Sequence, residues 1–110
     1  MQLRNPFSLN TRNLFLYVYS CFLCRRSDRG LELHHIVGRD SNSAFNACPL
    51  CTVCHAIMKH TQEEERELFF IVFKFLFTEK YKPDENDYSF LKKYWDRLVT
   101  QEVVEYLNKI

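Results

Sequence analysis

Side chains that bind metal ions or accept protons are concentrated in one part of this 110-residue sequence. Two Cys-x2-Cys pairs enclose a histidine pair and a lone asparagine, and the second cysteine pair runs directly into another histidine. The residues concerned are Cys21, Cys24, His34, His35, Asn46, Cys51, Cys54 and His55. Such a set could supply a structural metal site, a second cation site and a general base, which together suggest hydrolysis of a nucleic-acid phosphodiester bond.

The two cysteine pairs predict a structural zinc site. Two residues between thiolates allow each short turn to place both sulfurs about 2.3 Å from one tetrahedral Zn²⁺. A small two-stranded unit has too little core to hold itself together, so the ion would supply folding free energy. Coincidental core cysteines or a redox pair are the alternatives, but two pairs of equal spacing favour zinc. We expect the fifth cysteine, Cys48, to be a small buried side chain outside the site.

The adjacent histidines should have different tasks, because neighbouring residues of a strand point to opposite faces. We interpret His35 as a general base, since an unperturbed imidazole titrates near pH ~6.5. His34 would bind a cation through a neutral nitrogen, and His55, positioned by the adjoining Cys54, would be the second protein ligand. The alternative is a pair of partly exposed strand histidines without a chemical role. His60 is expected at a helix surface or in a turn, where it could touch DNA.

The order and spacing of these motifs resemble the zinc-binding branch of the HNH endonucleases over residues 12–60. The matching segments are Cys21-x2-Cys24, Leu33-His34-His35-Ile36, Asn46-x4-Cys51-x2-Cys54-His55 and, at the end of the family's signature, Lys59-His60. The resemblance implies a ββα-metal core, in which a hairpin and a helix enclose one catalytic divalent ion. It also implies cleavage of DNA that leaves 5′-phosphate and 3′-hydroxyl ends.

The resemblance further implies roles for single residues. His34 and His55 correspond to metal ligands, His35 to the general base, and Asn46 to the residue whose amide holds the base-bearing loop in place. The catalytic ion would be Mg²⁺, Mn²⁺, Ni²⁺ or Zn²⁺. Because imidazole suits Zn²⁺, Ni²⁺ and Mn²⁺ whereas Mg²⁺ prefers oxygen ligands, we expect activity with Mn²⁺ or Ni²⁺ to exceed that with Mg²⁺.

The distribution of charge favours DNA as a partner of the N-terminal half, although the net charge of the whole chain is only +1. Residues 1–60 carry seven basic against three acidic side chains, whereas residues 61–110 carry eight against eleven. Arg39 follows the histidine pair and could hold the reacting phosphate as a guanidinium fork. The other candidate DNA contacts are Arg25, Arg26 and Arg29. For these three, a solvated loop charge is an equal alternative.

The elements that must position these residues follow from hydrophobic periodicity and turn signals. We expect a helix over 12–19 capped by Asn10 or Thr11, a strand over 31–37, a loop over 38–43, a second strand over 45–50 interrupted by Pro49, and a helix from Thr52. Residues 1–60 would thus form the nuclease core, with its N-terminal helix and zinc site. The predicted fold class is α+β.

The rest of the chain, residues 61–110, should form a helical extension that packs on this core within one compact domain. Thr61-x-x-Glu64 fits a capping box at the start of a helix that contains the apolar run Leu68–Phe77. A helix that is apolar nearly all round must be covered on more than one side, and a strand is the competing prediction. Asp87 could cap the next helix.

Composition and terminal sequence bear on location and partners. A hydrophobic content of 46% and a charged content of 26% are those of a soluble globular protein. No apolar run reaches the roughly 20 residues of a membrane span, and the N-terminus has no secretory layout, so we expect a cytoplasmic protein. The aromatic C-terminal helices could bind a second copy or a larger protein. The alternative to a nuclease is a non-catalytic zinc module that binds nucleic acid or protein.

Overall fold

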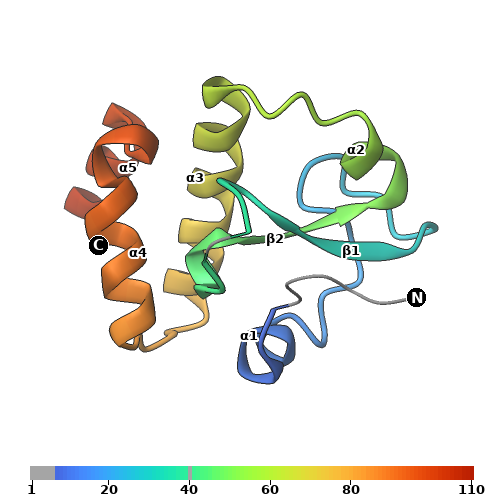
Figure 1. Ribbon diagram of the computed structural model, residues 1–110, viewed down its shortest axis with the longest axis horizontal. Coiled ribbons are helices and arrows are strands. Elements are labelled where there is room, and N and C mark those ends of the chain that lie inside the picture. Colours follow the sequence, from blue (N-terminus) through green and yellow to red (C-terminus); the bar gives the residue numbers. More distant parts are fainter. Residues whose placement is uncertain (1–6, 40) are drawn as a thin grey trace.

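The computed structural model describes residues 7–39 and 41–110 (Figure 1). The elements in chain order are α1 (Leu9–Leu14), β1 (Leu31–His35), the 3-10 turn η1 (Ala44–Asn46), β2 (Ala47–Cys51), α2 (Thr52–Ala56), α3 (Gln62–Thr78), α4 (Glu85–Leu98) and α5 (Gln101–Lys109). In Figure 1, α3 stands between the hairpin of β1 and β2 and the pair α4 and α5. This arrangement confirms the predicted α+β class, with a hairpin packed on helices and a helical C-terminal region.

The hairpin is antiparallel, and its register pairs His34 with Cys48 and Leu33 with Pro49. All five residues of β2 are buried, whereas in β1 only His34 is buried and only Glu32 is exposed. The second strand was predicted over 45–50 with an interruption at Pro49. It instead continues through this residue to Cys51. The carbonyl of Pro49 accepts a hydrogen bond from the backbone N–H of Phe22 at 3.0 Å, so the backbone groups of Pro49 point away from β1 and its missing N–H does not interrupt the pairing. The start of the predicted strand belongs to η1.

The first helix begins and ends earlier than the sequence pattern predicted. Its N-cap is Ser8 rather than Asn10 or Thr11, because the Ser8 side chain accepts a hydrogen bond from the backbone N–H of Thr11 at 3.3 Å. The helix stops before Phe15, which is buried and stacks on Phe75 of α3 with ring centroids 5.5 Å apart. Burial of this ring, rather than a further helical turn, determines the path of the chain toward the first cysteine pair.

The central helix α3 confirms the predicted capping box. The hydroxyl of Thr61 accepts from the N–H of Glu64 at 3.2 Å, and Oε1 of Glu64 accepts from the N–H of Thr61 at 3.4 Å. The buried residues of α3 are Glu65, Leu68, Phe69, Val72, Phe73 and Leu76. They are covered by β2 and η1 on one side and by α4 on another, as expected for so apolar a helix. Neither α3 nor any other helix in the described part of the chain is long and apolar enough to cross a membrane.

Helix α4 is joined to the hairpin connection through one buried carboxylate. Its N-cap is Asp84 rather than the predicted Asp87, and these two residues form a second capping box, with both bonds at 2.9 Å. Asp87 also accepts hydrogen bonds from the hydroxyl of Ser43 at 2.6 Å and the N–H of Ala44 at 3.1 Å. The hydroxyl of Tyr81 donates to the same carboxylate. The C-terminal helices are therefore tied to the segment that leads into β2.

Candidate metal centre and histidine cavity

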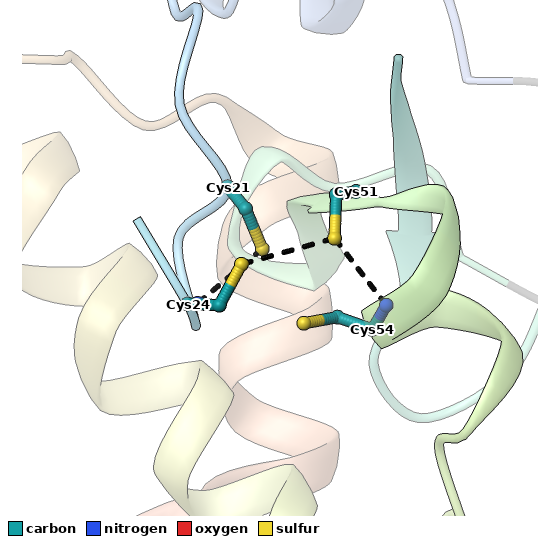
Figure 2. A group of neighbouring side chains, drawn as sticks. All are labelled: Cys21, Cys24, Cys51 and Cys54. Carbon is teal, nitrogen blue, oxygen red and sulfur yellow. Dashed lines mark hydrogen bonds between the residues drawn. The ribbon is translucent and has the colours of Figure 1, made fainter. Parts of the chain in front are cut away.

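Four cysteines converge beside the hairpin (Figure 2). Cys21 and Cys24 precede β1, Cys51 ends β2, and Cys54 lies in α2. Their sulfur atoms all lie within 4.8 Å of one another, and those of Cys24 and Cys51 are 3.8 Å apart. A tetrahedral zinc ion with ligands at about 2.3 Å has sulfurs about 3.8 Å apart along each edge. The four-cysteine group therefore fits a structural Zn²⁺, as the cysteine spacing predicted.

Hydrogen-bond donors around the sulfurs of Cys21 and Cys51 favour the thiolate form that binds zinc, whereas burial raises the pKa of Cys54. The backbone N–H of Cys54 donates to Sγ of Cys51 at 3.4 Å, and Nη1 of Arg29 donates to the same sulfur at 3.6 Å. The first of these bonds is the main reason why the pKa of Cys51 is lowered to about 6, and Arg29 adds to the effect. The N–H of Cys24 likewise donates to Sγ of Cys21 at 3.5 Å.

A short turn shapes the first cysteine pair. The N–H of Cys21 donates to the carbonyl of Arg26 at 2.9 Å, and the N–H of Arg25 donates back to the carbonyl of Cys21 at 2.9 Å. Arg25 adopts a left-handed backbone conformation with φ of 68°, which tightens the turn. The fifth cysteine, Cys48, is fully buried outside the four-cysteine group, and burial raises its pKa. This matches the predicted role of Cys48 as a small core side chain.

All four histidines of the chain line a single cavity of ≈ 480 Å³, which we call the histidine cavity. The ring of His34 in β1 lies 5.0 Å from that of His55 in α2, measured between centroids. It lies 5.4 Å from the ring of His60, which follows α2 in a left-handed conformation with φ of 59°. His60 was predicted in a turn or on a helix surface, and no sequence signal indicated its contact with His34.

His34 is kept neutral by its surroundings. His34 is only 4% exposed. Burial is the main reason why its pKa is lowered to about 4, and the nearby imidazoles of His55 and His60 lower it further. A neutral imidazole retains a nitrogen lone pair at pH 7 and can therefore act as a metal ligand. The environment of His34 is thus compatible with cation binding, which is the role that the resemblance implied for it.

His55 is oriented by a carboxylate. Its Nδ1 lies 2.6 Å from Oε1 of Glu32, so a proton on Nδ1 is donated to the carboxylate and Nε2 is left to accept. Metal-binding histidines in proteins commonly have such a carboxylate on the nitrogen that does not bind the metal. Glu32 was not among the predicted site residues. Because residues two apart in a strand share a face, its position relative to His34 was the signal that could have identified it.

His35 lines the histidine cavity from the next position in β1. Its ring is stacked on that of Phe7, with centroids 3.9 Å apart and planes 12° from parallel. Phe7 is itself buried, so this contact limits the orientations open to the imidazole. No sequence signal linked Phe7 to the site, because it precedes His35 by 28 residues without a motif around it. The role of His35 as a general base stays a prediction.

The side chain of Asn46 closes the connection between the two strands. It is fully buried at the end of η1, and its Oδ1 accepts from the N–H of Val37 at 2.9 Å. Its Nδ2 donates to the carbonyls of Gly38 and Ser41 at 3.0 and 2.9 Å. One amide therefore satisfies three backbone groups of the loop that directly follows the histidine pair. This geometry is compatible with the loop-holding role that the resemblance implied for Asn46.

The four arginines proposed as DNA contacts lie in different surroundings. Arg39 lines the histidine cavity. Arg26 forms an exposed ion pair with Asp28 at 2.6 Å, Arg29 contacts the sulfur of Cys51 as described above, and Arg25 is exposed in the cysteine turn. Contact of any of them with DNA stays a prediction, and Arg39 alone of the four lies beside the histidines.

The C-terminal helices contribute Glu65 and Arg97 to the wall of the histidine cavity. Neither residue belongs to a motif, and only the packing of α3 and α4 brings them there. Across residues 7–39 and 41–110, the four cysteines are the only group of three or more potential ligands whose donor atoms lie so close together. The histidines are near one another but do not form an equally compact group. The cavity therefore holds a more open arrangement than the four-cysteine group.

Comparisons with protein-family models, with curated proteins and with solved structures find no match to this chain. The resemblance to the HNH endonucleases accordingly depends on the motifs alone. What the structure establishes is an α+β protein in which a four-cysteine, zinc-site-like group adjoins a hairpin that is followed by helices.

Proposed function

We propose that the protein is a metal-dependent endonuclease of the HNH type that hydrolyses phosphodiester bonds in DNA. The observation that best supports this function is the presence of His34, His35, His55 and His60 around one cavity, beside a separate four-cysteine group. A zinc module that only stabilises a fold or presents a surface requires the cysteines but has no need of such a histidine cavity. Arg39, which lines the cavity, is exposed, so a phosphate entering the cavity could contact a cationic side chain.

The residues that would hold the catalytic cation are His34 and His55, with His60 as a third ligand. His34 is neutral, and the contact of His55 with Glu32 leaves Nε2 available. Three imidazoles suit Mn²⁺, Ni²⁺ or Zn²⁺ better than Mg²⁺. A cation at this position would offset the negative charge that develops on the scissile phosphate and the leaving 3′-oxygen.

Other residues of the histidine cavity would accept the proton, hold the loop after β1 and bind the phosphate. His35 would accept the proton of the attacking water, which requires an imidazole that is neutral near pH 7 and held in one orientation. Stacking on Phe7 restricts that orientation, and the three hydrogen bonds of Asn46 hold the loop after His35. Arg39 would bind a non-bridging phosphate oxygen through its guanidinium N–H groups. These residues would bring water, base and phosphate together in one site.

The direct test is cleavage of supercoiled plasmid DNA by the zinc-loaded protein, with Mg²⁺, Mn²⁺ or Ni²⁺ added in separate reactions. We expect nicked or linear product, with higher rates in Mn²⁺ or Ni²⁺ than in Mg²⁺. The variant His35→Ala should lower the rate by about 10²–10⁴-fold, since general-base catalysis contributes about this much. Zinc content and the circular dichroism spectrum should be unchanged, which separates a chemical role from a folding defect.

Two outcomes would count against the proposal. If wild type and His35→Ala cut DNA equally, the activity comes from a contaminant or from another site. If both are inert with every metal while still binding one zinc ion per chain, the protein is a non-catalytic zinc module. Equal or better cleavage in Mg²⁺ alone would contradict only the assignment of an all-histidine cation site.

A further inference from the structure

One wall of the histidine cavity comes from a part of the chain that the nuclease motif does not include. Arg97 at the end of α4 and Glu65 in α3 line the cavity together with His60 and Arg39. The guanidinium of Arg97 therefore lies in the wall of the same cavity as the histidines. Arg97 could therefore have two roles: it links α4 to α3 through Glu65, and it could bind the substrate.

Arg97 is fixed through both its side chain and its backbone. Its Nε and Nη2 donate to the two carboxylate oxygens of Glu65 at 2.8 and 2.7 Å. Its carbonyl accepts hydrogen bonds from Nε2 of Gln62 at 3.2 Å and from Nε of Arg66 at 2.9 Å. A long side chain that is already ordered loses little conformational entropy when it binds a further group.

The ion pair with Glu65 leaves N–H groups of Arg97 available for a further hydrogen bond. The Glu65 side chain is 5% exposed, whereas that of Arg97 is 48% exposed, so the carboxylate is buried and the guanidinium reaches solvent. A guanidinium has five N–H donors, and the bidentate pair with Glu65 uses two of them. The other three include both N–H groups of Nη1, and this planar fork matches the oxygens of a phosphate.

We propose that Arg97 binds a backbone phosphate of the DNA substrate and that Glu65 is its positioning residue. The inference depends on the proposed function, because it takes DNA to be the substrate of the histidine cavity. It assigns to α3 and α4 a part in substrate binding, where composition alone indicated only a core-packing extension. Arg39 on the loop after β1 and Arg97 on α4 would then contact the DNA backbone from two separate elements that line one cavity.

The test measures DNA binding apart from cleavage. Zinc-loaded protein carrying His35→Ala is titrated against a fluorescently labelled duplex at a series of salt concentrations, without added catalytic cation. Each phosphate neutralised by a cationic side chain contributes about 0.9 to the slope of log Kd against log salt concentration. The slope therefore counts ionic contacts, which a purely structural link between α3 and α4 would not change.

The variants are chosen so that the buried carboxylate is never left without a partner. Glu65→Gln combined with Arg97→Gln replaces the ion pair by two amides, and should lower the slope by about 0.9 and weaken binding roughly tenfold. Glu65→Gln alone keeps Arg97 and its ionic contact, so the slope should be retained, but the neutral amide holds the guanidinium less firmly and binding should weaken about threefold. Lys92→Ala, which removes an exposed charge from the same helix, is the matched control and should leave both quantities unchanged.

The possible failures can be told apart. If wild type cuts DNA but the double variant keeps the full slope, Arg97 is only a structural link and the nuclease proposal stands. If the slope falls as expected but wild type is inert, Arg97 binds phosphate in a DNA-binding module and the nuclease proposal fails. If Lys92→Ala lowers the slope as much as the double variant, loss of any cation from α4 has the same effect, Arg97 makes no specific contact and the inference is wrong.

Discussion

The four-cysteine group and the histidine cavity both collect potential metal ligands, yet they differ in how complete they are. The four sulfurs lie within 4.8 Å of one another and satisfy a tetrahedral ion without any outside ligand. The imidazoles of His55 and His60 lie 5.0 and 5.4 Å from that of His34 and border a cavity of ≈ 480 Å³. A closed ligand set stabilises a fold, whereas an open one leaves room for a substrate. This difference indicates that the two sites have different tasks.

The two sites share the same short elements, and this makes one depend on the other. Cys54 and His55 are adjacent in α2, so the residue that completes the four-cysteine group also determines where His55 lies. The helix has only five residues and would not be stable alone. The histidine cavity should therefore require the cysteines, while the four-cysteine group should not require the histidines. The predictions below test that asymmetry.

The largest effect is expected from Cys51→Ala. Structural zinc sites contribute about 10–16 kcal/mol of binding free energy, which is as large as the roughly 5–15 kcal/mol that stabilises a whole domain. We expect zinc content to fall from one ion per chain to nearly none and the hairpin to unfold. Elemental analysis and circular dichroism would measure the two changes. One full equivalent of tightly bound zinc in this variant would contradict the assignment.

Cys48→Ala is the matched control for that experiment. The residue lies in the same strand and is equally buried, but it is outside the four-cysteine group. Loss of one buried sulfur should destabilise the protein by about 1 kcal/mol, as for other small core truncations. Zinc content should be unchanged. Equal loss of zinc in both variants would mean that truncation of any buried residue of β2 releases the ion. It would contradict the assignment of Cys51 as a zinc ligand on the basis of this experiment.

An effect smaller than that of Cys51→Ala is expected from Asn46→Ala, which changes the histidine cavity and not the four-cysteine group. The change leaves the N–H of Val37 and the carbonyls of Gly38 and Ser41 without their partner, at a total cost of roughly 3 kcal/mol in the free energy of unfolding. Urea unfolding would measure it. Zinc content should stay at one ion per chain, because the amide makes no contact with the cysteines. Asn86→Ala, at an exposed position in α4, should change the stability by less than about 0.5 kcal/mol.

The sequence was most informative where one residue type has one dominant use. Two Cys-x2-Cys pairs predicted the four-cysteine group, and Thr61-x-x-Glu64 predicted the start of α3, because these signals are local and specific. The sequence was ambiguous where several neighbouring residues could take the same structural role, such as the N-cap of a helix. Asp84 and Asp87 are both good N-caps, and burial of Asp87 against the connection before β2 decides between them. Only the folded structure holds that information.

As with the fold, the parts of the candidate site that stand in local motifs were predictable from the sequence, and the parts brought in by distant contacts were not. The histidines stand in motifs, and alternation along β1 placed Glu32 on the face of His34. Arg97 lies 62 residues after His35 in a helix whose periodicity predicted only packing. Its position beside the cavity results from the packing of α4 on α3 and from its pair with Glu65. Such contacts between distant segments have no local sequence signal.

The smallest and most specific effect is expected from Glu32→Gln. The amide oxygen can still accept a hydrogen bond from Nδ1–H of His55, but the side chain no longer carries the charge that strengthens the imidazole as a ligand. Carboxylates in this position typically contribute about 10–100-fold to metal affinity, so Mn²⁺ or Ni²⁺ binding by calorimetry should weaken by that factor. The exposed carboxylate of Glu63 provides a control, since Glu63→Gln should have no effect. Zinc bound to the cysteines should be unaffected in either variant. If Glu32→Gln released this zinc while leaving the Mn²⁺ or Ni²⁺ affinity unchanged, the two sites would not be separate in the way that their geometry indicates.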